Sequence, residues 1–343
     1  MYDYIFVTHI PAFYKVNLYN KLASELNILV LFIAEDTEEK RAEDFVTLDK
    51  ADFNYLVLSN GCLQRRDAWK NITKIKKILN ETDYNQLVVG GWDLKEFWYI
   101  ALFNSKEKNC LALESTVFES NAKGLKGILK KIFLHNMSRV FASGKLHVEL
   151  LRSLNYSGKI SITAGVGIIN QPYFNLPEKT FRKRFLYVGR LTKVKNLEFL
   201  ISVFNTLPDY FLTIVGDGEE LNYLKAIANS NVVFVPPINN ASLKNVYLSH
   251  DVFVLPSISE PWGLVVEEAI YFEMPVIISK NCGSVELILD GKNGYIFDPE
   301  NEGSLKDCIM RINKHTYADM INFLKSTHRK NNLLLEKINP YVN

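Results

Sequence analysis

Short apolar runs alternate with segments of helical periodicity along the chain. Residues 4–8, 28–33 and 86–91 are apolar runs with the length of buried strands. Residues 16–26 instead place apolar side chains three and four positions apart, as a helix with one buried face does. Strands and helices that alternate in this way form parallel sheets covered by helices on both faces. The pattern therefore predicts an α/β protein.

The alternation is interrupted near the middle of the chain. Residues 169–183 contain two prolines and little periodicity, and a new strand-like run begins at residue 184. A chain of 343 residues is long enough for two domains. We expect two Rossmann-like domains that face each other across a cleft. The predicted parts are an N-terminal domain over 1–168, a linker over 169–183, a C-terminal domain over 184–315 and a helical tail over 316–343.

Composition narrows the class of protein. The net charge of +2 argues against a dedicated nucleic-acid-binding protein. The four cysteines are scattered without a C-x-x-C pair, so neither a disulfide framework nor a zinc site is expected. The N-terminus carries no secretory signal, and the longest apolar run, residues 28–34, is far shorter than the ~20 residues of a membrane span. We expect a cytoplasmic protein, with peripheral attachment to the inner face of the membrane left open.

A lysine-rich segment, residues 123–135, is the feature that points to a membrane. Its four lysines lie away from a single apolar stripe, and no Asp or Glu occurs between residues 120 and 148. One interpretation is a helix that packs on the sheet and exposes a solvated lysine face. The other is a surface that contacts anionic lipid or a lipid-linked acceptor. The stripe consists of Leu125, Ile128, Leu129, Ile132 and Phe133.

The clearest chemical signal lies in residues 251–269. A strand-like run over 251–256 is followed by Glu260, then by Gly263 and a helical segment that contains Glu268. A glycine at a helix start leaves backbone N–H groups unpaired at the positive end of the helix dipole, which suits a phosphate. The two carboxylates are suited to accepting hydrogen bonds from hydroxyls. A sugar nucleotide supplies both kinds of group.

Two cations occur earlier in the same half of the chain. Gly189 and Arg190 end the strand-like run that begins at residue 184, and Lys195 lies five residues further on. An arginine fork and a lysine point charge suit a diphosphate, although surface charge on a loop is the simpler interpretation of the spacing alone. No D-x-D sequence occurs, so we expect no bound metal ion. The cations would then neutralise the departing diphosphate.

Taken in order, these segments resemble a known enzyme family. The segments are Gly189-Arg-Leu with Lys195, then Val215-Gly-Asp-Gly, then Glu260-Pro-Trp-Gly-Leu-Val-Val-Glu-Glu-Ala, then Asn293-Gly-Tyr. Their order and spacing are similar to those of the GT-B retaining glycosyltransferases of family 4, and they include that family's E-x7-E motif. The similarity covers about residues 184–300, while the N-terminal half is similar in kind only. The resemblance implies a GT-B fold.

The resemblance also implies a role for each matching residue. Arg190 and Lys195 would hold the donor diphosphate. Glu260 would face the donor sugar, and Glu268 would bind the ribose hydroxyls. Pro236-Pro237 departs from the family, because a glycine is usual there, and this leaves recognition of the base least defined; Gly283-Ser284 stands where many members have paired glycines. The other donor-binding positions implied are Gly189, Gly216, Ile238, Gly263, Leu264 and Val265.

The N-terminal domain is expected to carry the acceptor site. Ligands of parallel sheets bind beyond the carboxyl ends of the strands. The candidates there are His9 and Tyr14, in the loop after the first strand, and Glu114, at the end of a later strand. A lone loop histidine is more often an ordinary polar residue, and Glu114 is a hypothesis that rests on its strand-end position.

The predicted reaction transfers a hexose from a UDP-, GDP- or ADP-sugar to a hydroxyl of a glycan or lipid-linked acceptor, with retention at the anomeric carbon and without a cofactor. The resemblance implies a setting in bacterial surface polysaccharide or lipid-linked glycan synthesis. Two alternatives stay open. One is a nucleotide-sugar epimerase of the same fold, and the other is a non-catalytic, sugar-nucleotide-binding partner of a glycan assembly complex. The sugar, the base, the acceptor and the linkage are not determined by the sequence.

Overall fold

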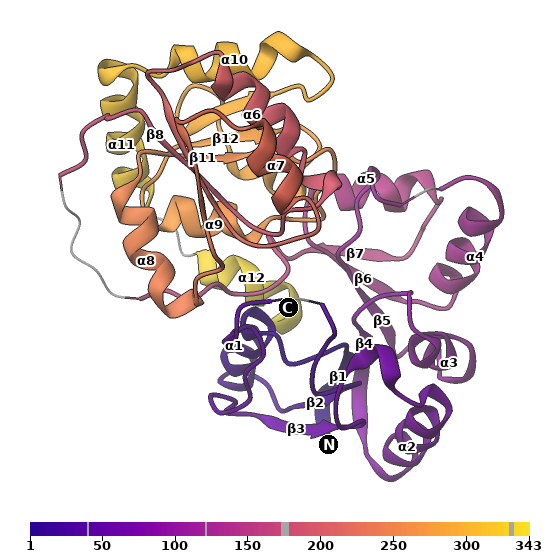
Figure 1. Cartoon of the computed structure of the whole chain (residues 1–343). Helices are drawn as coiled ribbons and strands as arrows, with labels where there is room; N and C mark the ends of the chain where they lie inside the picture. The colour runs from indigo at the N-terminus through magenta and orange to yellow at the C-terminus, as the bar shows by residue number, and fades with distance from the viewer. Residues whose placement is uncertain (40, 121, 173–177, 329–332) are drawn as a thin grey trace. The chain divides into compact units, whose positions relative to one another are not determined.

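The computed structural model describes the chain except for residues 40, 121, 173–177 and 329–332, so part of the predicted linker lies outside the described residues. The chain forms two compact units (Figure 1). The first unit comprises Met1–Glu39, Phe45–Ile168 and Asn332–Asn343, and the second comprises Lys40–Asp44 and Ile169–Asn331.

The described residues of the first unit form a parallel sheet of seven strands in the order β3-β2-β1-β4-β5-β6-β7. Strand β2 is apolar along its whole length, and the carboxyl halves of β1 and β4 are buried, as expected for strands covered on both faces. The strands are β1 (Tyr2–Thr8), β2 (Ile28–Phe32), β3 (Asn54–Val57), β4 (Tyr84–Val89), β5 (Asn109–Leu113), β6 (Arg139–Ala142) and β7 (Lys159–Ile162).

Helices cover both faces of this sheet. Because side chains alternate along a strand, Ile5 and Val7 of β1 enter one apolar cluster, whereas Tyr4 and Phe6 enter the cluster on the opposite face. The Asp67 carboxylate starts one helix by accepting the backbone N–H groups of its first turn. The helices are α1 (Phe13–Ala23), α2 (Ala68–Glu81), α3 (Lys95–Phe103), α4 (Gly124–His135), α5 (Lys145–Ser153) and α12 (Leu333–Val342), with a short 3-10 turn at Leu63–Arg65.

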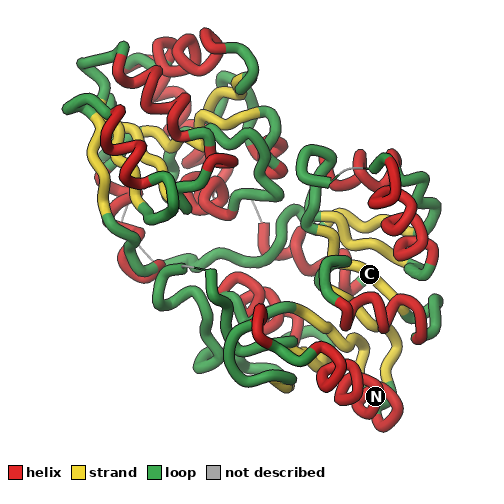
Figure 2. Tube along the Cα trace, turned by 45° about the vertical axis from the view of Figure 1, so that its right-hand side comes forward, coloured by secondary structure: helices red, strands yellow, loops and turns green. Residues whose placement is uncertain are grey.

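The described residues of the second unit form a parallel sheet of six strands in the order β10-β9-β8-β11-β12-β13. Its strands lie between layers of helix, as the strand and helix colours of Figure 2 show. The strands are β8 (Arg184–Val188), β9 (Phe211–Val215), β10 (Val232–Val235), β11 (Val252–Leu255), β12 (Val276–Ser279) and β13 (Gly294–Phe297). The helices are α6 (Leu197–Asn205), α7 (Leu221–Ile227), α8 (Asn240–Ser249), α9 (Leu264–Tyr271), α10 (Glu302–Arg311) and α11 (Lys314–His328), with 3-10 turns at Lys193–Lys195 and Gly283–Leu287.

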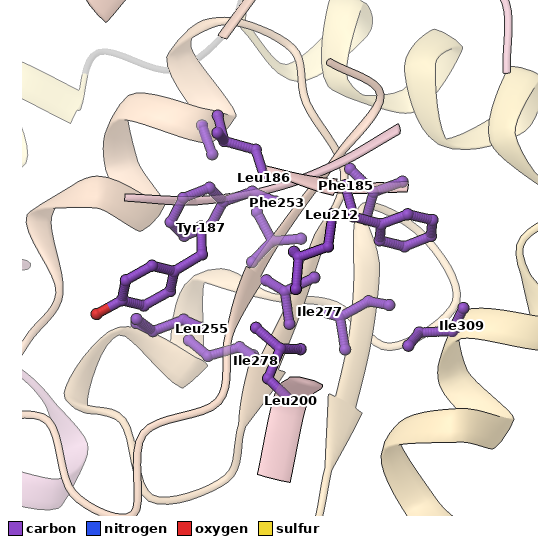
Figure 3. Packing of buried hydrophobic residues seen from close by; sticks show 14 of the residues in the cluster. Phe185, Leu186, Tyr187, Leu200, Leu212, Phe253, Leu255, Ile277, Ile278 and Ile309 are labelled. Atoms are coloured by element: carbon purple, nitrogen blue, oxygen red, sulfur yellow. The ribbon is translucent and has the colours of Figure 1, made fainter. Parts of the chain in front are cut away.

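One apolar cluster runs through the second unit. Phe185, Phe253 and Ile277 from its strands pack with Leu200 of α6 and Ile309 of α10 (Figure 3). These side chains are fully buried, so the cluster fixes the strands and thereby the loops that leave their carboxyl ends. The prediction of two Rossmann-like domains with parallel sheets is confirmed. None of the described helices is both long enough and apolar enough to cross a membrane.

The segment predicted as a helical tail contributes to both units. Helix α11 belongs to the second unit, and α12 belongs to the first. On the first unit, Tyr341 stacks on Phe141 with ring centroids 4.2 Å apart, and its carbonyl accepts a hydrogen bond of 3.0 Å from the Tyr4 hydroxyl. Aromatic burial of this kind fixes α12 firmly.

Candidate functional site

The loop from β11 to α9, residues 256–263, carries Glu260 and is held in place by backbone hydrogen bonds on two sides. The N–H of Ile258 donates to the carbonyl of Val194 (2.9 Å), in the turn before α6. On the other side, the N–H of Gly283 donates to the carbonyl of Glu260 (2.9 Å). The position of the Glu260 backbone is therefore set by its neighbours rather than by the loop alone.

Gly263 ends this loop and precedes α9. Its φ of 92° lies in the left-handed region, and a Cβ there would lie 2.9 Å from Leu255 Cδ2, so glycine is required for both reasons. No side chain caps α9 at this position. Within the described residues, the N–H groups of Leu264 and Val265 have no hydrogen-bond partner. Two donors at the positive end of a helix are a suitable seat for a phosphate or a sugar hydroxyl.

Lys195 and Glu260 form an ion pair at this end of the sheet. The Lys195 ammonium donates to Glu260 Oε2, and the two side chains are 14% and 13% exposed. Asn196, in the left-handed conformation, follows Lys195 and donates to the carbonyl of Pro256 (3.3 Å), which ties the lysine turn to the glutamate loop. The structure thus brings together a cation and an acid that are separated by 65 residues in the sequence.

Arg190 follows β8, and its backbone is held by a buried tyrosine of that strand. The buried Tyr187 hydroxyl donates to the Arg190 carbonyl (2.9 Å). Burial raises the pKa of Tyr187 well above its usual value, the charge of Glu260 raises it further, and the charge of Arg190 opposes the rise. Both charged groups therefore act on one phenol.

The glycine turn after β9 packs directly on the loop that carries Arg190. Gly216 has a φ of 149°, and a Cβ at this position would lie 1.9 Å from the Gly189 carbonyl oxygen. The N–H of Leu191 donates to the Asp217 carbonyl (2.9 Å), so the two loops are joined backbone to backbone. Only glycine permits this approach.

Glu268, in α9, is almost fully buried. Its Oε2 accepts a hydrogen bond of 2.8 Å from the Tyr247 hydroxyl, whereas its Oε1 has no partner among the described residues. Burial raises the pKa of the carboxyl to about 7, against the Tyr247 hydrogen bond and with help from the charge of Glu267. One oxygen is thus available to a ligand. The adjacent Glu267 instead accepts from the indole of the buried Trp262 (2.6 Å) and fixes the loop before α9.

Ile238 follows β10 at the same edge of the second sheet. Its half-buried side chain packs against the main apolar cluster. Pro236 and Pro237, which precede it, are exposed. The position predicted for base contact is therefore a fixed point of the backbone.

At the carboxyl edge of the first sheet, two residues form a contact that the sequence did not reveal. His9 follows β1, and its Nε2 lies 2.9 Å and 3.1 Å from the two carboxylate oxygens of Asp93, which follows β4. The imidazole also packs edge-on against Phe97 at 5.1 Å. Burial acts to raise the pKa of Asp93, but the hydrogen bond and charge of His9 outweigh it and lower the pKa. The sequence signal for this pair is Gly91. A Cβ at this position would lie 2.6 Å from Asp93 Oδ1, so a larger residue would displace the carboxylate.

Glu114 follows β5 on the same edge and pairs with a buried lysine. Lys15, in the first turns of α1, donates to Glu114 Oε1. Tyr14 precedes this lysine, whose ammonium lies 5.7 Å from the tyrosine ring centroid. The strands β1, β4 and β5 are neighbours, so the three predicted acceptor-side residues belong to one edge of the first unit. The described residues include no group of three or more acidic, histidine or cysteine side chains that could hold a metal ion.

The two Rossmann-like units, each built on a parallel sheet, give the chain a GT-B fold. Residues 173–325 match the family described as Glycosyl transferases group 1. This match covers most of the second unit, and it confirms for that part of the chain the resemblance inferred from the motifs.

Individual relatives agree with this assignment. The chain is 36% identical over 142 residues to sulfoquinovosyl transferase SQD2 of Arabidopsis thaliana, which covers 40% of this chain and 26% of that protein. It is 27% identical over 265 residues to an uncharacterised glycosyltransferase of Haemophilus influenzae, which covers 73% of this chain and 72% of that one. The match to the plant protein thus spans about a quarter of its length.

Solved structures share the fold over nearly the whole chain. Sucrose-phosphate synthase of Thermosynechococcus elongatus superposes with a TM-score of 0.75 at 18% identity, over 99% of this chain and 96% of that one. Anabaena HepE, in complex with UDP and glucose, superposes with a TM-score of 0.73 at 16% identity, over 98% of this chain and 97% of that one. Because the identities to these two structures are 18% and 16%, the superpositions show that the fold is shared.

Proposed function

We propose that this protein transfers a hexose from a nucleoside diphosphate sugar to an acceptor hydroxyl, with retention at the anomeric carbon. The observation that supports the proposal most is the Lys195–Glu260 ion pair beside the unpaired N–H groups at the start of α9. A cation, two backbone donors and a carboxylate within one loop system match a substrate that combines a diphosphate with a sugar.

In the proposed reaction the bond from the anomeric carbon to the donor phosphate breaks, and a bond to the acceptor oxygen forms on the same face. The acceptor proton passes to the departing phosphate, so a nucleoside diphosphate and a glycoside are the products. Lys195 and Arg190 offset the charge that develops on the phosphate. Glu260 orients the sugar, and Oε1 of Glu268 accepts a ribose hydroxyl. No metal ion or cofactor takes part in the proposal.

The acceptor-side part of the proposal concerns the first unit. With His9 Nε2–H donating to Asp93, the other ring nitrogen, Nδ1, is an acceptor for a hydroxyl proton. Glu114 retains one carboxylate oxygen beyond its bond to Lys15. We assign both to orientation of the acceptor. Unchanged transfer rate and acceptor affinity in Glu114→Gln would remove that residue from the proposal.

The first experiment is a thermal-shift screen with UDP-, GDP- and ADP-sugars. A ligand that binds the folded chain stabilises it by about 2.7 kcal/mol at a hundredfold excess over its Kd, so the correct donor raises the melting temperature most. The donor is then incubated with glycan and lipid-linked acceptors, and the anomeric configuration of the product is read by NMR. Inversion would refute retention. Conversion of the donor without any acceptor would instead indicate an epimerase, and tight binding without turnover a non-catalytic binding protein.

We also propose a cytoplasmic role in bacterial surface polysaccharide or lipid-linked glycan synthesis. Support comes from the family assignment and from the exposed basic helix α4. Analysis of surface glycans after deletion of the gene in its host tests this setting, and an unchanged glycan profile would contradict it.

A further inference from the structure

Helix α4 exposes the apolar face that amphipathic helices ordinarily bury. Only Phe133 of the predicted stripe is buried, together with Gly127 and Leu134. The interpretation in which the whole stripe packs on the sheet is therefore wrong for its other four residues. These are Leu125, Ile128, Leu129 and Ile132, which are 73%, 56%, 43% and 45% exposed.

Helix α2 of the same unit shows that this arrangement is unusual. It is also lysine-rich and amphipathic, but its Ile72 and Ile75 are buried and its Ile78 and Leu79 are half-buried. The apolar side of α2 thus stabilises the sheet, whereas the apolar side of α4 contributes little to the core. Exposing four aliphatic side chains in one row is costly in water and usually marks a binding surface.

Two lysines of α4 flank the exposed row, one on each side. Successive residues of a helix are about 100° apart, so Lys126 and Lys131 project about 110° to either side of the centre of the row. Both lysines are exposed. Long lysine stems in this position reach around an apolar surface and keep their charges at its border. This is the geometry of a helix that lies in a membrane interface.

The surface next to α4 also exposes apolar side chains. Helix α4 packs beside α3 at the outer side of the unit (Figure 1), and Trp98 of α3 contacts the Phe133 ring at 5.0 Å. The end of α3 exposes Leu102 and Phe103, and Phe118, in the loop before α4, is also exposed. No carboxylate occurs from residue 120 to residue 148, so nothing on α4 repels an anionic surface.

We propose that the exposed row of α4, bordered by Lys126 and Lys131, docks this protein on an anionic lipid bilayer. The aliphatic row enters the boundary between headgroups and acyl chains, and the lysines contact lipid phosphates. A folded protein partner fits less well, because α4 exposes neither a carboxylate nor an aromatic anchor that would give specificity. The proposal does not depend on the transfer reaction.

Sedimentation with lipid vesicles tests the proposal with the full-length chain. The protein is expected to bind vesicles of phosphatidylcholine mixed with phosphatidylglycerol more tightly than vesicles of phosphatidylcholine alone, and to dissociate as salt is added. Each lysine at a membrane surface contributes about fivefold in partition, so Lys126→Gln with Lys131→Gln should weaken binding about 25-fold. The matched control is Lys70→Gln with Lys76→Gln, which removes the same charge from α2 and should leave binding within about twofold.

The apolar half of the surface has its own test. Ile128→Ser with Ile132→Ser should weaken binding about tenfold or more, while the melting temperature stays near that of the parent because both side chains are exposed. Leu289→Ser with Val233→Ser removes two aliphatic side chains of similar exposure from the second unit and should not change binding.

Three results would overturn the proposal. The first is equal binding of the parent protein to both kinds of vesicle at low salt. The second is an equal loss of binding in the α4 variants and in their controls. The third is a dimer in sedimentation equilibrium that Ile128→Ser with Ile132→Ser converts to a monomer, because the row would then be an interface between two copies of the chain.

Discussion

Glu268 allows a quantitative test of how burial changes the pKa of a carboxyl and, through it, the stability of the second unit. Burial raises the pKa of its carboxyl from 4.5 to about 7. Between these two pH values the folded chain binds a proton that the unfolded chain releases. The contribution of this proton to stability is therefore fully present below about pH 4.5 and is lost as the pH rises through about 7.

The change in unfolding free energy follows from the pKa shift of Glu268. A difference of about 2.5 pKa units corresponds to about 3 kcal/mol of unfolding free energy. Glu268→Gln removes the charge and keeps an oxygen for the Tyr247 hydroxyl, at a cost of about 1 kcal/mol for a less suitable hydrogen bond. At pH 8 the variant should be more stable than the parent by about 2 kcal/mol, or about 4–8 °C in melting temperature for a unit of this size. At pH 5 it should be equal or slightly less stable.

Differential scanning calorimetry at pH 5 and pH 8 measures this difference directly. Glu219→Gln is the control, because it removes the same charge from an exposed position of the second unit and should change stability by no more than about 0.5 kcal/mol at either pH. A Glu268→Gln shift of the same sign and size at both pH values would refute the reasoning, since a neutral carboxyl and a charged one would then be equally tolerated.

The other predictions concern the two sheet edges. Arg190→Ala and Lys195→Ala should each lower turnover about 10²–10³-fold, because each removes a group that stabilises developing charge; normal turnover in both would contradict the donor assignment. Asp93→Asn should raise the acceptor KM several-fold with little change in donor affinity, because it releases His9, and an unchanged KM would count against it. Gly216→Ala should destabilise the second unit by about 2–4 kcal/mol, because its Cβ would meet the Gly189 carbonyl, and an unchanged melting temperature would disprove that contact.

The strands of both sheets were largely predictable because apolar runs are a local signal. The run that begins at residue 184 is β8, and the run over residues 232–235 is β10. The strands β6 and β7 and the helices α3 and α5 were not predicted, since β6, β7 and α5 are short and α3 is apolar on several sides. Length and period decide whether a pattern can be recognised.

Long-range pairing accounts for the rest of what the sequence did not reveal. The motif spacing indicated Glu260 and Lys195 separately, but their ion pair depends on β8 and β11 being neighbours in the sheet. The strand-end positions of His9 and Asp93 indicated the functional edge for each of them, but their contact joins residues 84 positions apart and could not be read from the sequence. The same limit applies to α12, whose period predicts a helix but does not state which unit it joins.

For Glu268, the sequence predicts the position of the carboxyl but not its protonation state. Its spacing from Glu260 predicts a hydroxyl-binding acid, and its unpartnered Oε1 agrees with that role. A carboxyl with a pKa of about 7, however, is protonated in a substantial fraction of molecules near neutral pH, and a protonated carboxyl donates a hydrogen bond as well as accepting one. If ribose hydroxyls prefer the charged form, binding of a nucleotide releases a proton and strengthens as the pH rises from 6 to 8. Calorimetric titration with UDP in two buffers of different ionisation enthalpy measures that proton, and proton uptake on binding would show instead that the neutral acid is the form that holds the ribose.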